Sequence, residues 1–170
     1  MRIVPHDPAW PARFEEERAA LAELLGDVVT GGIHHVGSTA VPGLAAKPIV
    51  DIQVGVADLE TARSCIEPLA ALDYVYAPYR VEEIAWFCKP SPQRRTHHLH
   101  LVPVDAPRFR AVLEFRDLLR SDPEVAREYE ALKRRLAAEL GHDREAYTRA
   151  KQPFVSDALE RARLARRTRT

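Results

Sequence analysis

The sequence has few of the features that mark secreted or membrane-spanning proteins. Its two cysteines, Cys65 and Cys88, are too few for a disulfide framework and have no CxxC or Cys/His spacing. No apolar run approaches the roughly 18 residues that a membrane span needs, and residues 1–10 lack the apolar stretch of a signal peptide. We therefore expect a soluble protein of the cytoplasm, where thiols stay reduced.

The chain also lacks an excess of charge of either sign. Lysine plus arginine and aspartate plus glutamate each number 25, so the formal net charge at pH 7 is +0. Without a strong overall field, neither nucleic acid nor an anionic membrane is the expected partner. The one basic segment, RARLARRTRT at residues 161–170, is interpreted as the solvated end of a helix.

The composition is that of one folded domain, with 46% hydrophobic and 29% charged residues in 170. Asp7 and Pro8 predict a helix start that Gly26 ends. The order is a helix, two strands, a helix, three strands and a helical C-terminal third broken twice. This predicts a single α+β domain over residues 1–170 with the helices on one side of the sheet. The predicted strands are residues 28–36, 49–56, 73–78, 83–89 and 97–103. The predicted helices are residues 8–25, 58–71 and 107 onward, with breaks at 121–123 and 141–143.

Two cations fall on helix faces that are otherwise apolar. Arg116 lies within the apolar stripe of the segment that begins at residue 107, and Lys151 follows Tyr147 by four residues on another stripe. One interpretation is structural: Arg116 bonds a carboxylate or a carbonyl, and Lys151 extends its ammonium to water. The other is that both bind the phosphate of a ligand.

Polar side chains also alternate along two predicted strands. His98 and His100 share one face of their strand, and Asp51 and Gln53 share one face of theirs. If the strands are neighbours, one carboxylate and two imidazoles form a candidate divalent-metal set of Asp51, His98 and His100. Histidines two apart are also common in ordinary strands, so a purely structural role stays open. Ordinary hydrogen bonding is expected for the other histidines of these regions, His34, His35 and His97.

The segment HHVGSTAVPGLAAKPIVDIQV, residues 34–54, resembles the signature of the GrpB family, HVGST-VPGL-AKP-IDI. The resemblance continues in order along nearly the whole chain. Its further segments are HHLHLV at 97–102, FRDLLR at 115–120, YEALK at 129–133 and YTRAKQPF at 147–154.

That resemblance implies a nucleotidyltransferase-like fold: a mixed β-sheet flanked by helices, with a glycine-serine turn before a strand that bears carboxylates. In active relatives of this fold the turn holds a nucleoside triphosphate and the carboxylates hold Mg²⁺. The resemblance therefore implies that Gly37 and Ser38 approach phosphate oxygens and that Asp51 is a metal carboxylate.

The sequence departs from that pattern where a second carboxylate is expected. Position 53 is Gln53, whose amide supplies no negative charge, and the later strand offers His98 and His100 instead of a third carboxylate. Imidazole ligands favour Mn²⁺ or Zn²⁺ over Mg²⁺. Standard two-metal nucleotidyl transfer is therefore in question.

Three functions remain open. The first is metal-dependent transfer of a nucleotidyl or phosphoryl group from a nucleoside triphosphate to a small acceptor. The second is an inactive domain that binds a nucleotide or phosphorylated metabolite, for which fusions of such domains to dephospho-coenzyme A kinase suggest a link to coenzyme A metabolism. The third is an Asp/His metal-dependent hydrolase. The candidate residues are Asp51 and Arg116 for catalysis, Gly37, Ser38, Thr39, Lys47 and Lys151 for phosphate, and Asp51, His98 and His100 for the metal.

Overall fold

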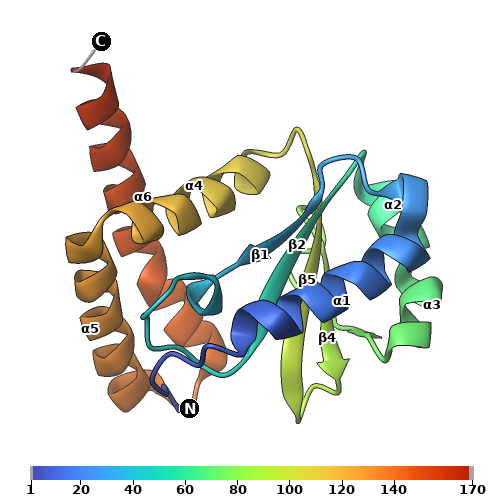
Figure 1. Ribbon diagram of the computed structural model, residues 1–170, viewed down its shortest axis with the longest axis horizontal. Coiled ribbons are helices and arrows are strands. Elements are labelled where there is room, and N and C mark those ends of the chain that lie inside the picture. The colour runs from blue at the N-terminus through green and yellow to red at the C-terminus, as the bar shows by residue number, and fades with distance from the viewer. Residues whose placement is uncertain (1, 169–170) are drawn as a thin grey trace.

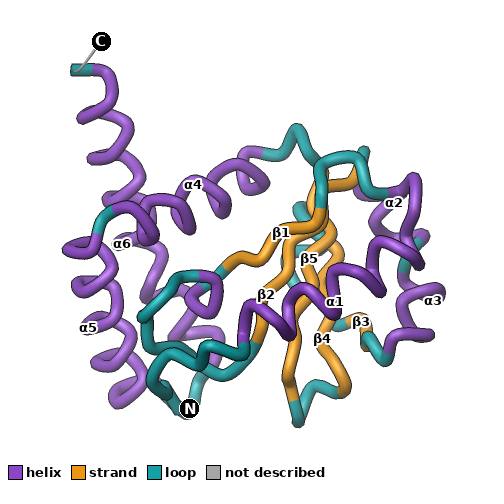
Figure 2. The backbone as a smooth tube through the Cα atoms, viewed as in Figure 1, coloured by secondary structure: helices purple, strands orange, loops and turns teal. Residues whose placement is uncertain are grey.

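A computed structural model describes residues 2–168, and its centre is a five-stranded mixed sheet (Figures 1 and 2). The strand order is β1-β2-β5-β4-β3. The two inner strands β2 and β5 run parallel, whereas all other neighbours are antiparallel. The strands are β1 (Ile33–Val36), β2 (Val50–Val56), β3 (Val75–Tyr76), β4 (Ala85–Pro90) and β5 (Arg95–Pro103).

One face of the sheet is covered by α1 (Trp10–Leu25), α2 (Leu59–Ser64) and α3 (Ile66–Leu69). Alternate residues of the inner strands, among them Ile52 and Leu99, are fully buried against these helices. Such burial of branched side chains is the main source of stability for a domain of this kind, about 25 cal/mol per Å² of apolar surface. This layer is the larger core and contains none of the candidate site residues.

The C-terminal third forms α4 (Pro107–Ser121), α5 (Pro123–Leu140) and α6 (Arg144–Arg167). Phe109 of α4 packs against Trp86 and Val102 on the other face of the sheet, and α4, α5 and α6 pack on one another beside it (Figure 1). The expectation of helices on one side is therefore wrong, because the apolar stripe of α4 is buried against the opposite face. The basic segment at 161–170 does close a helix, although residues 169–170 lie outside the described part.

Several element boundaries differ from those predicted, for local reasons. Asp7 accepts a hydrogen bond from the backbone N–H of Ala9 at 2.9 Å, so it closes a turn ahead of α1 and the helix begins only at Trp10. The first strand is shorter than predicted because Val28 belongs to a 3-10 turn and Gly32, just before the strand, adopts φ 82°. The helix predicted over 58–71 divides at Cys65. The breaks after α4 and α5 are confirmed.

Cys65 and Cys88 are both buried and unpaired. Within residues 2–168, none of the helices combines the length and the apolar character needed to cross a bilayer.

Candidate functional site

The second face of the sheet brings four polar side chains of the inner strands together. In the parallel pairing of β2 with β5, Asp51 lies opposite His98 and Gln53 opposite His100. Because side chains two residues apart in a strand point the same way, all four share one face. The predicted neighbourhood of the two strands is therefore correct.

Asp51 and His98 form a hydrogen-bonded pair. Asp51 Oδ1 lies 2.9 Å from Nδ1 of His98, and the two side chains are 30% and 19% exposed. Burial pushes the pKa of Asp51 upward, but the hydrogen bond and charge of His98, with a further contribution from Lys151, outweigh it and leave the pKa below its usual value. Asp51 is thus the anionic group at the centre of this face.

Gln53 serves the scaffold. It is only 1% exposed, and its Nε2 donates to the backbone carbonyl of Phe109 at 3.0 Å, which ties β2 to the first turn of α4. His100 is also withdrawn from solvent, and burial lowers its pKa to about 3. The ring of Trp86 lies 5.0 Å from that of His98 and 6.4 Å from that of His100. The imidazoles are therefore packed on an aromatic side chain.

These residues do not by themselves fit a divalent-metal site. Among residues 2–168, no three histidine, cysteine, aspartate or glutamate side chains gather closely enough to hold a metal ion. The face supplies one carboxylate, and that carboxylate is already bonded to His98. Mg²⁺ and Mn²⁺ favour several oxygen ligands, so the assignment of a metal to Asp51, His98 and His100 stays a prediction.

The glycine-serine turn lies against Asp51. Gly37 adopts φ 71° and ψ −172°, a conformation essentially restricted to glycine. A Cβ at this position would lie 2.5 Å from Asp51 Oδ2. Ser38 opens a 3-10 turn and lines the same cavity as Tyr129. Gly37 and Ser38 are therefore beside the carboxylate, as predicted.

Thr39, unlike Gly37 and Ser38, does not face the cavity beside the turn. It is 2% exposed, and its Oγ1 lies 3.0 Å from Nε2 of His35. The structure thus places Thr39 and His35 in the scaffold beneath the turn. His34 has the ordinary contact that the sequence predicted, with Nε2 2.8 Å from the Gly31 carbonyl, and His97 Nδ1 lies 2.9 Å from Thr96 Oγ1.

We expect Gly37→Ala to lower the free energy of unfolding by about 2–3 kcal/mol, because it combines a strained φ with a steric clash against Asp51. Gly43→Ala is the matched control: Gly43 also has a positive φ, of 78°, but a Cβ there would meet nothing within 4 Å. Urea unfolding of both variants separates backbone strain from the clash. Equal losses in the two variants would mean that the approach of Gly37 to Asp51 does not matter.

Three of the four lysines in the chain gather next to this turn. Lys47 Nζ lies 4.0 Å and Lys151 Nζ 4.5 Å from the centroid of the Tyr147 ring. Lys133 Nζ lies 5.1 Å from the centroid of the Tyr129 ring. Lys47, Lys133 and Lys151 are called the lysine cluster below.

The lysine cluster places several cations in a poorly solvated region. Burial, reinforced by the charge of Lys151, lowers the pKa of Lys47 to about 7. Burial likewise lowers the pKa of Lys133 to about 7 and that of Lys151 below its usual value. Asp51 is the carboxylate that raises the pKa of both Lys47 and Lys151. Glu130 raises the pKa of Lys133, so two carboxylates that already have partners face three lysines.

Lys133 was missed by the reasoning from sequence, although a signal was present. Tyr129, Lys133 and Leu136 recur at helical spacing and form the buried stripe of α5, which is the same anomaly that singled out Lys151. Lys133 donates to the carbonyl of Ala45, while Glu130 accepts from the Ala45 N–H at 3.0 Å. These bonds hold the loop that carries Lys47 against α5.

The lysine cluster predicts an unusual pH dependence of stability. Because the pKa values of Lys47 and Lys133 fall from 10.5 to about 7 on folding, the unfolded chain binds more protons above pH 7, and the free energy of unfolding should rise with pH. We expect a rise of about 1 kcal/mol per pH unit for each lysine between pH 7 and 9. Above that range the raised pKa values of the two buried thiols and of Tyr147 act in the opposite direction.

Urea unfolding at pH 7, 8 and 9 without ligand measures this slope. A flat or falling free energy over this range would show that the lysines titrate normally and would contradict the buried cluster.

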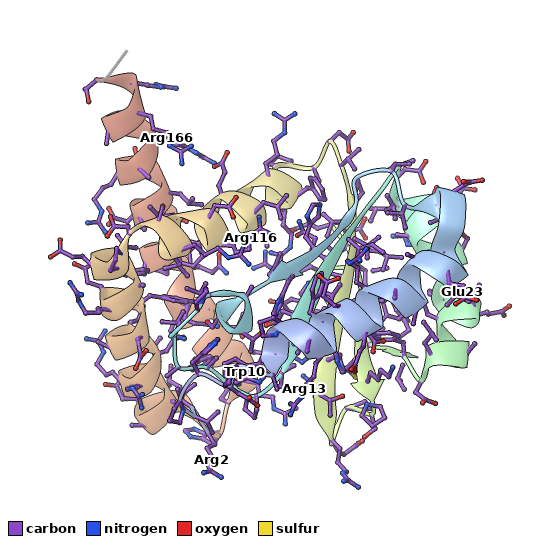
Figure 3. The ribbon with its side chains drawn as sticks, viewed as in Figure 1. Arg2, Trp10, Arg13, Glu23, Arg116 and Arg166 are labelled. Atoms are coloured by element: carbon purple, nitrogen blue, oxygen red, sulfur yellow. The ribbon has the colours of Figure 1, made fainter. Side chains whose placement is uncertain are left out.

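Arg116 combines features of both interpretations. Its Nε donates to Asp117 at 2.7 Å and its Nη1 donates to the His35 carbonyl at 3.2 Å, so it has the structural partners that one interpretation required. Its side chain is 15% exposed and lines a cavity together with Gly37 and Ser38. Figure 3 labels it between α4 and the strands. Arg116 is thus anchored and also faces open space beside the turn.

Comparison with known proteins identifies the family of the chain. The model of the GrpB protein family matches residues 1–161. A UPF0157 protein of Pseudomonas aeruginosa is 40% identical, over 98% of this chain and 69% of the relative. The glutamate-rich protein GrpB of Alkalihalophilus pseudofirmus is 36% identical, over 92% of both chains. A dephospho-CoA kinase of Mycolicibacterium paratuberculosis is 31% identical over 95% of this chain but only 46% of the kinase.

Solved structures agree with this relationship and show the fold. The crystal structure of GrpB from Enterococcus faecalis superposes with a TM-score of 0.83 at 32% identity, covering 95% of this chain and 96% of that one. The structure of the GLD-2/RNP-8 complex gives a TM-score of 0.54 at 16% identity, covering 81% of this chain and 46% of that one. The crystal structure of Cid1 poly(U) polymerase gives a TM-score of 0.51 at 15% identity, covering 80% of this chain and 43% of that one. At that identity the likeness shows a nucleotidyltransferase-like fold and nothing more. Sequence and structure together place this chain in the GrpB family.

Proposed function

We propose that this protein binds a nucleoside triphosphate through its phosphates, at the surface formed by Ser38, Lys47 and Lys151. One observation carries the proposal: within residues 2–168, the ammonium groups of Lys47 and Lys151 have no hydrogen-bond acceptor and no ion pair, only the ring of Tyr147. Desolvated cations without counter-charges are costly. A polyanion would supply the missing charge.

The charge balance favours several phosphates over one. Three ammonium groups face two carboxylates, and both are already paired, Asp51 with His98 and Glu130 with Arg134. Bound phosphate oxygens would raise the lowered pKa values of the lysines and accept their hydrogen bonds. Gly37 presents no side chain on the side of Asp51, so the backbone of the turn lies directly against the carboxylate. We therefore expect affinity to increase from a mono- to a triphosphate.

A second candidate function, transfer of a nucleotidyl or phosphoryl group to a small acceptor, is favoured by a separate observation. A cavity of about 340 Å³ adjoins Gly37 and Ser38 on the side of α4. Fixed cations that neutralise phosphate charge stabilise the transition state of such transfers. In this function Lys47 and Lys151 hold the triphosphate, Arg116 stabilises the charge that develops, and Asp51 orients the reacting groups. The position of Gln53 in the scaffold instead favours binding without turnover.

The identity of the ligand is tested by titration of ATP, ADP, AMP, tripolyphosphate and dephospho-coenzyme A. The last is included because of the similarity to a dephospho-CoA kinase. The proposal predicts that ATP and tripolyphosphate bind more tightly than ADP, and ADP more tightly than AMP. Equal affinity for ATP and AMP, or no binding by any of these compounds, would rule out a triphosphate site.

Turnover separates the two candidate functions. Products of ATP are followed with Mg²⁺, with Mn²⁺ and without added metal, in wild-type protein and in Asp51→Ala. Turnover that disappears in Asp51→Ala while ATP still binds supports transfer. Binding of ATP without turnover under every metal condition supports a binding domain.

A further inference from the structure

The cavity beside the turn differs in character from the lysine cluster. It lies between α4, α5 and α6 on one side and Gly37 and Ser38 on the other, and Arg80 and Glu83 also line it. Its volume of about 340 Å³ is at the lower end of the range for small-molecule sites, about 300–1,000 Å³. Much of its wall is apolar, formed by Ala111, Val112, Phe115, Leu119 and Val155.

Three guanidinium groups line this cavity, against one carboxylate. Arg116 is held by Asp117 and by the His35 carbonyl. Arg80 donates to Glu83 at 3.4 Å and to the Tyr79 hydroxyl at 3.3 Å. The carboxylate of the cavity is thus already paired, and Arg108 is left without an ion pair in the part of the chain that the structure describes.

Arg108 occupies a position that is unfavourable for a cation in the unliganded protein. Its Nε is buried and has no hydrogen-bond partner among residues 2–168. It stands in the first turn of α4, which has no acidic residue and where the helix dipole disfavours positive charge. Burial and the charge of Arg80 lower its pKa, with Glu83 acting in the opposite direction, yet a guanidinium stays protonated. An anion bound in the cavity would remove these penalties.

We infer that the cavity binds a small amphipathic acid, with a carboxylate or phosphate head on Arg108 and an apolar body against Phe115 and Leu119. A guanidinium fork matches both kinds of head group, because each presents two oxygens in one plane. The net positive charge of the cavity selects an acid over a neutral or cationic ligand of the same shape. Ser38 and Tyr129 line this cavity, and the Tyr129 ring also contacts Lys133. The acid is therefore placed as the acceptor of the transferred group, a role that rests on the proposed function.

The test uses three ligands of similar shape and size. They are 3-phenylpropionate, phenyl phosphate and the uncharged 3-phenylpropanamide, titrated by calorimetry or ligand-observed NMR. Wild-type protein should bind at least one of the two acids at least about tenfold more tightly than the amide, and the preferred acid distinguishes a carboxylate from a phosphate head. Similar affinities for the acids and the amide, or no binding of either acid, would overturn the inference.

Arg108→Met should remove the preference for the acid, and Arg110→Met should keep it, because Arg110 belongs to the same helix turn but is exposed. A preference that persists in Arg108→Met would overturn the assignment of the head group. The comparison of acid with amide on wild-type protein stands even if a variant fails to fold. ATP is titrated in parallel. If the protein binds an acid but not ATP, this inference is supported and the proposed function is contradicted. If it binds ATP but neither acid, only this inference is contradicted.

Discussion

Replacing Lys151 by methionine should weaken the binding of ATP by at least about tenfold, equivalent to ~1.4 kcal/mol. The ammonium of Lys151 packs on the Tyr147 ring and has no acceptor or ion pair among the described residues, so a bound phosphate would be its main partner. The same substitution should leave the thermal stability of the unliganded protein unchanged or higher, because it removes a partly desolvated charge.

Arg149→Met is the matched control for that variant. Arg149 is on the same helix, its side chain is 69% exposed, and its partner is Glu145 at 3.5 Å. Calorimetric titration with ATP and a thermal melt are measured for both variants. If Lys151→Met melts far below wild type and still binds ATP normally, Lys151 belongs to the scaffold.

Restoring the second carboxylate, by Gln53→Glu, should destabilise the protein by about 3–5 kcal/mol at pH 7. The Gln53 amide donates to the Phe109 carbonyl in a position that is 1% exposed. A glutamate would remove that donor and bury an uncompensated charge against a carbonyl oxygen. Gln53→Met, which is similar in shape and uncharged, should cost only about 1–3 kcal/mol.

Urea unfolding ranks the two Gln53 variants, and Mg²⁺ titration of Gln53→Glu asks whether the standard motif is restored. We expect the stability to decrease from wild type to methionine to glutamate, without a gain in Mg²⁺ affinity. A glutamate variant as stable as wild type that binds Mg²⁺ more tightly would show that this position still serves a metal.

The fold was largely predictable because its elements are marked locally. Alternating apolar residues marked the inner strands, and Pro107, Pro123 and the 141–143 turn marked the helices of the C-terminal third. Which face of the sheet those helices cover was not predictable. That depends on the crossover between β2 and β5 and on contacts such as that of Phe109 with Trp86, which join residues far apart in the chain.

The candidate site was predictable where the two-residue spacing of side chains along a strand places them on the same face of the sheet. Asp51, Gln53, His98 and His100 are on one face because their strands are parallel neighbours in register. The role of Gln53 was not predictable, since its partner is a backbone carbonyl 56 residues away. The role of Arg108 was not predictable either. Its lack of an ion pair among the described residues follows from the pairing of Glu83 with Arg80, which only the structure shows.

The most direct test of the central claim is a crystal structure of the protein soaked with ATP. We predict that phosphate oxygens lie within hydrogen-bond distance of Ser38 Oγ and of the ammonium groups of Lys47 and Lys151, beside Asp51. Phosphates bound away from these groups, or lysines that keep only the Tyr147 ring as their partner at saturating ATP, would contradict the account.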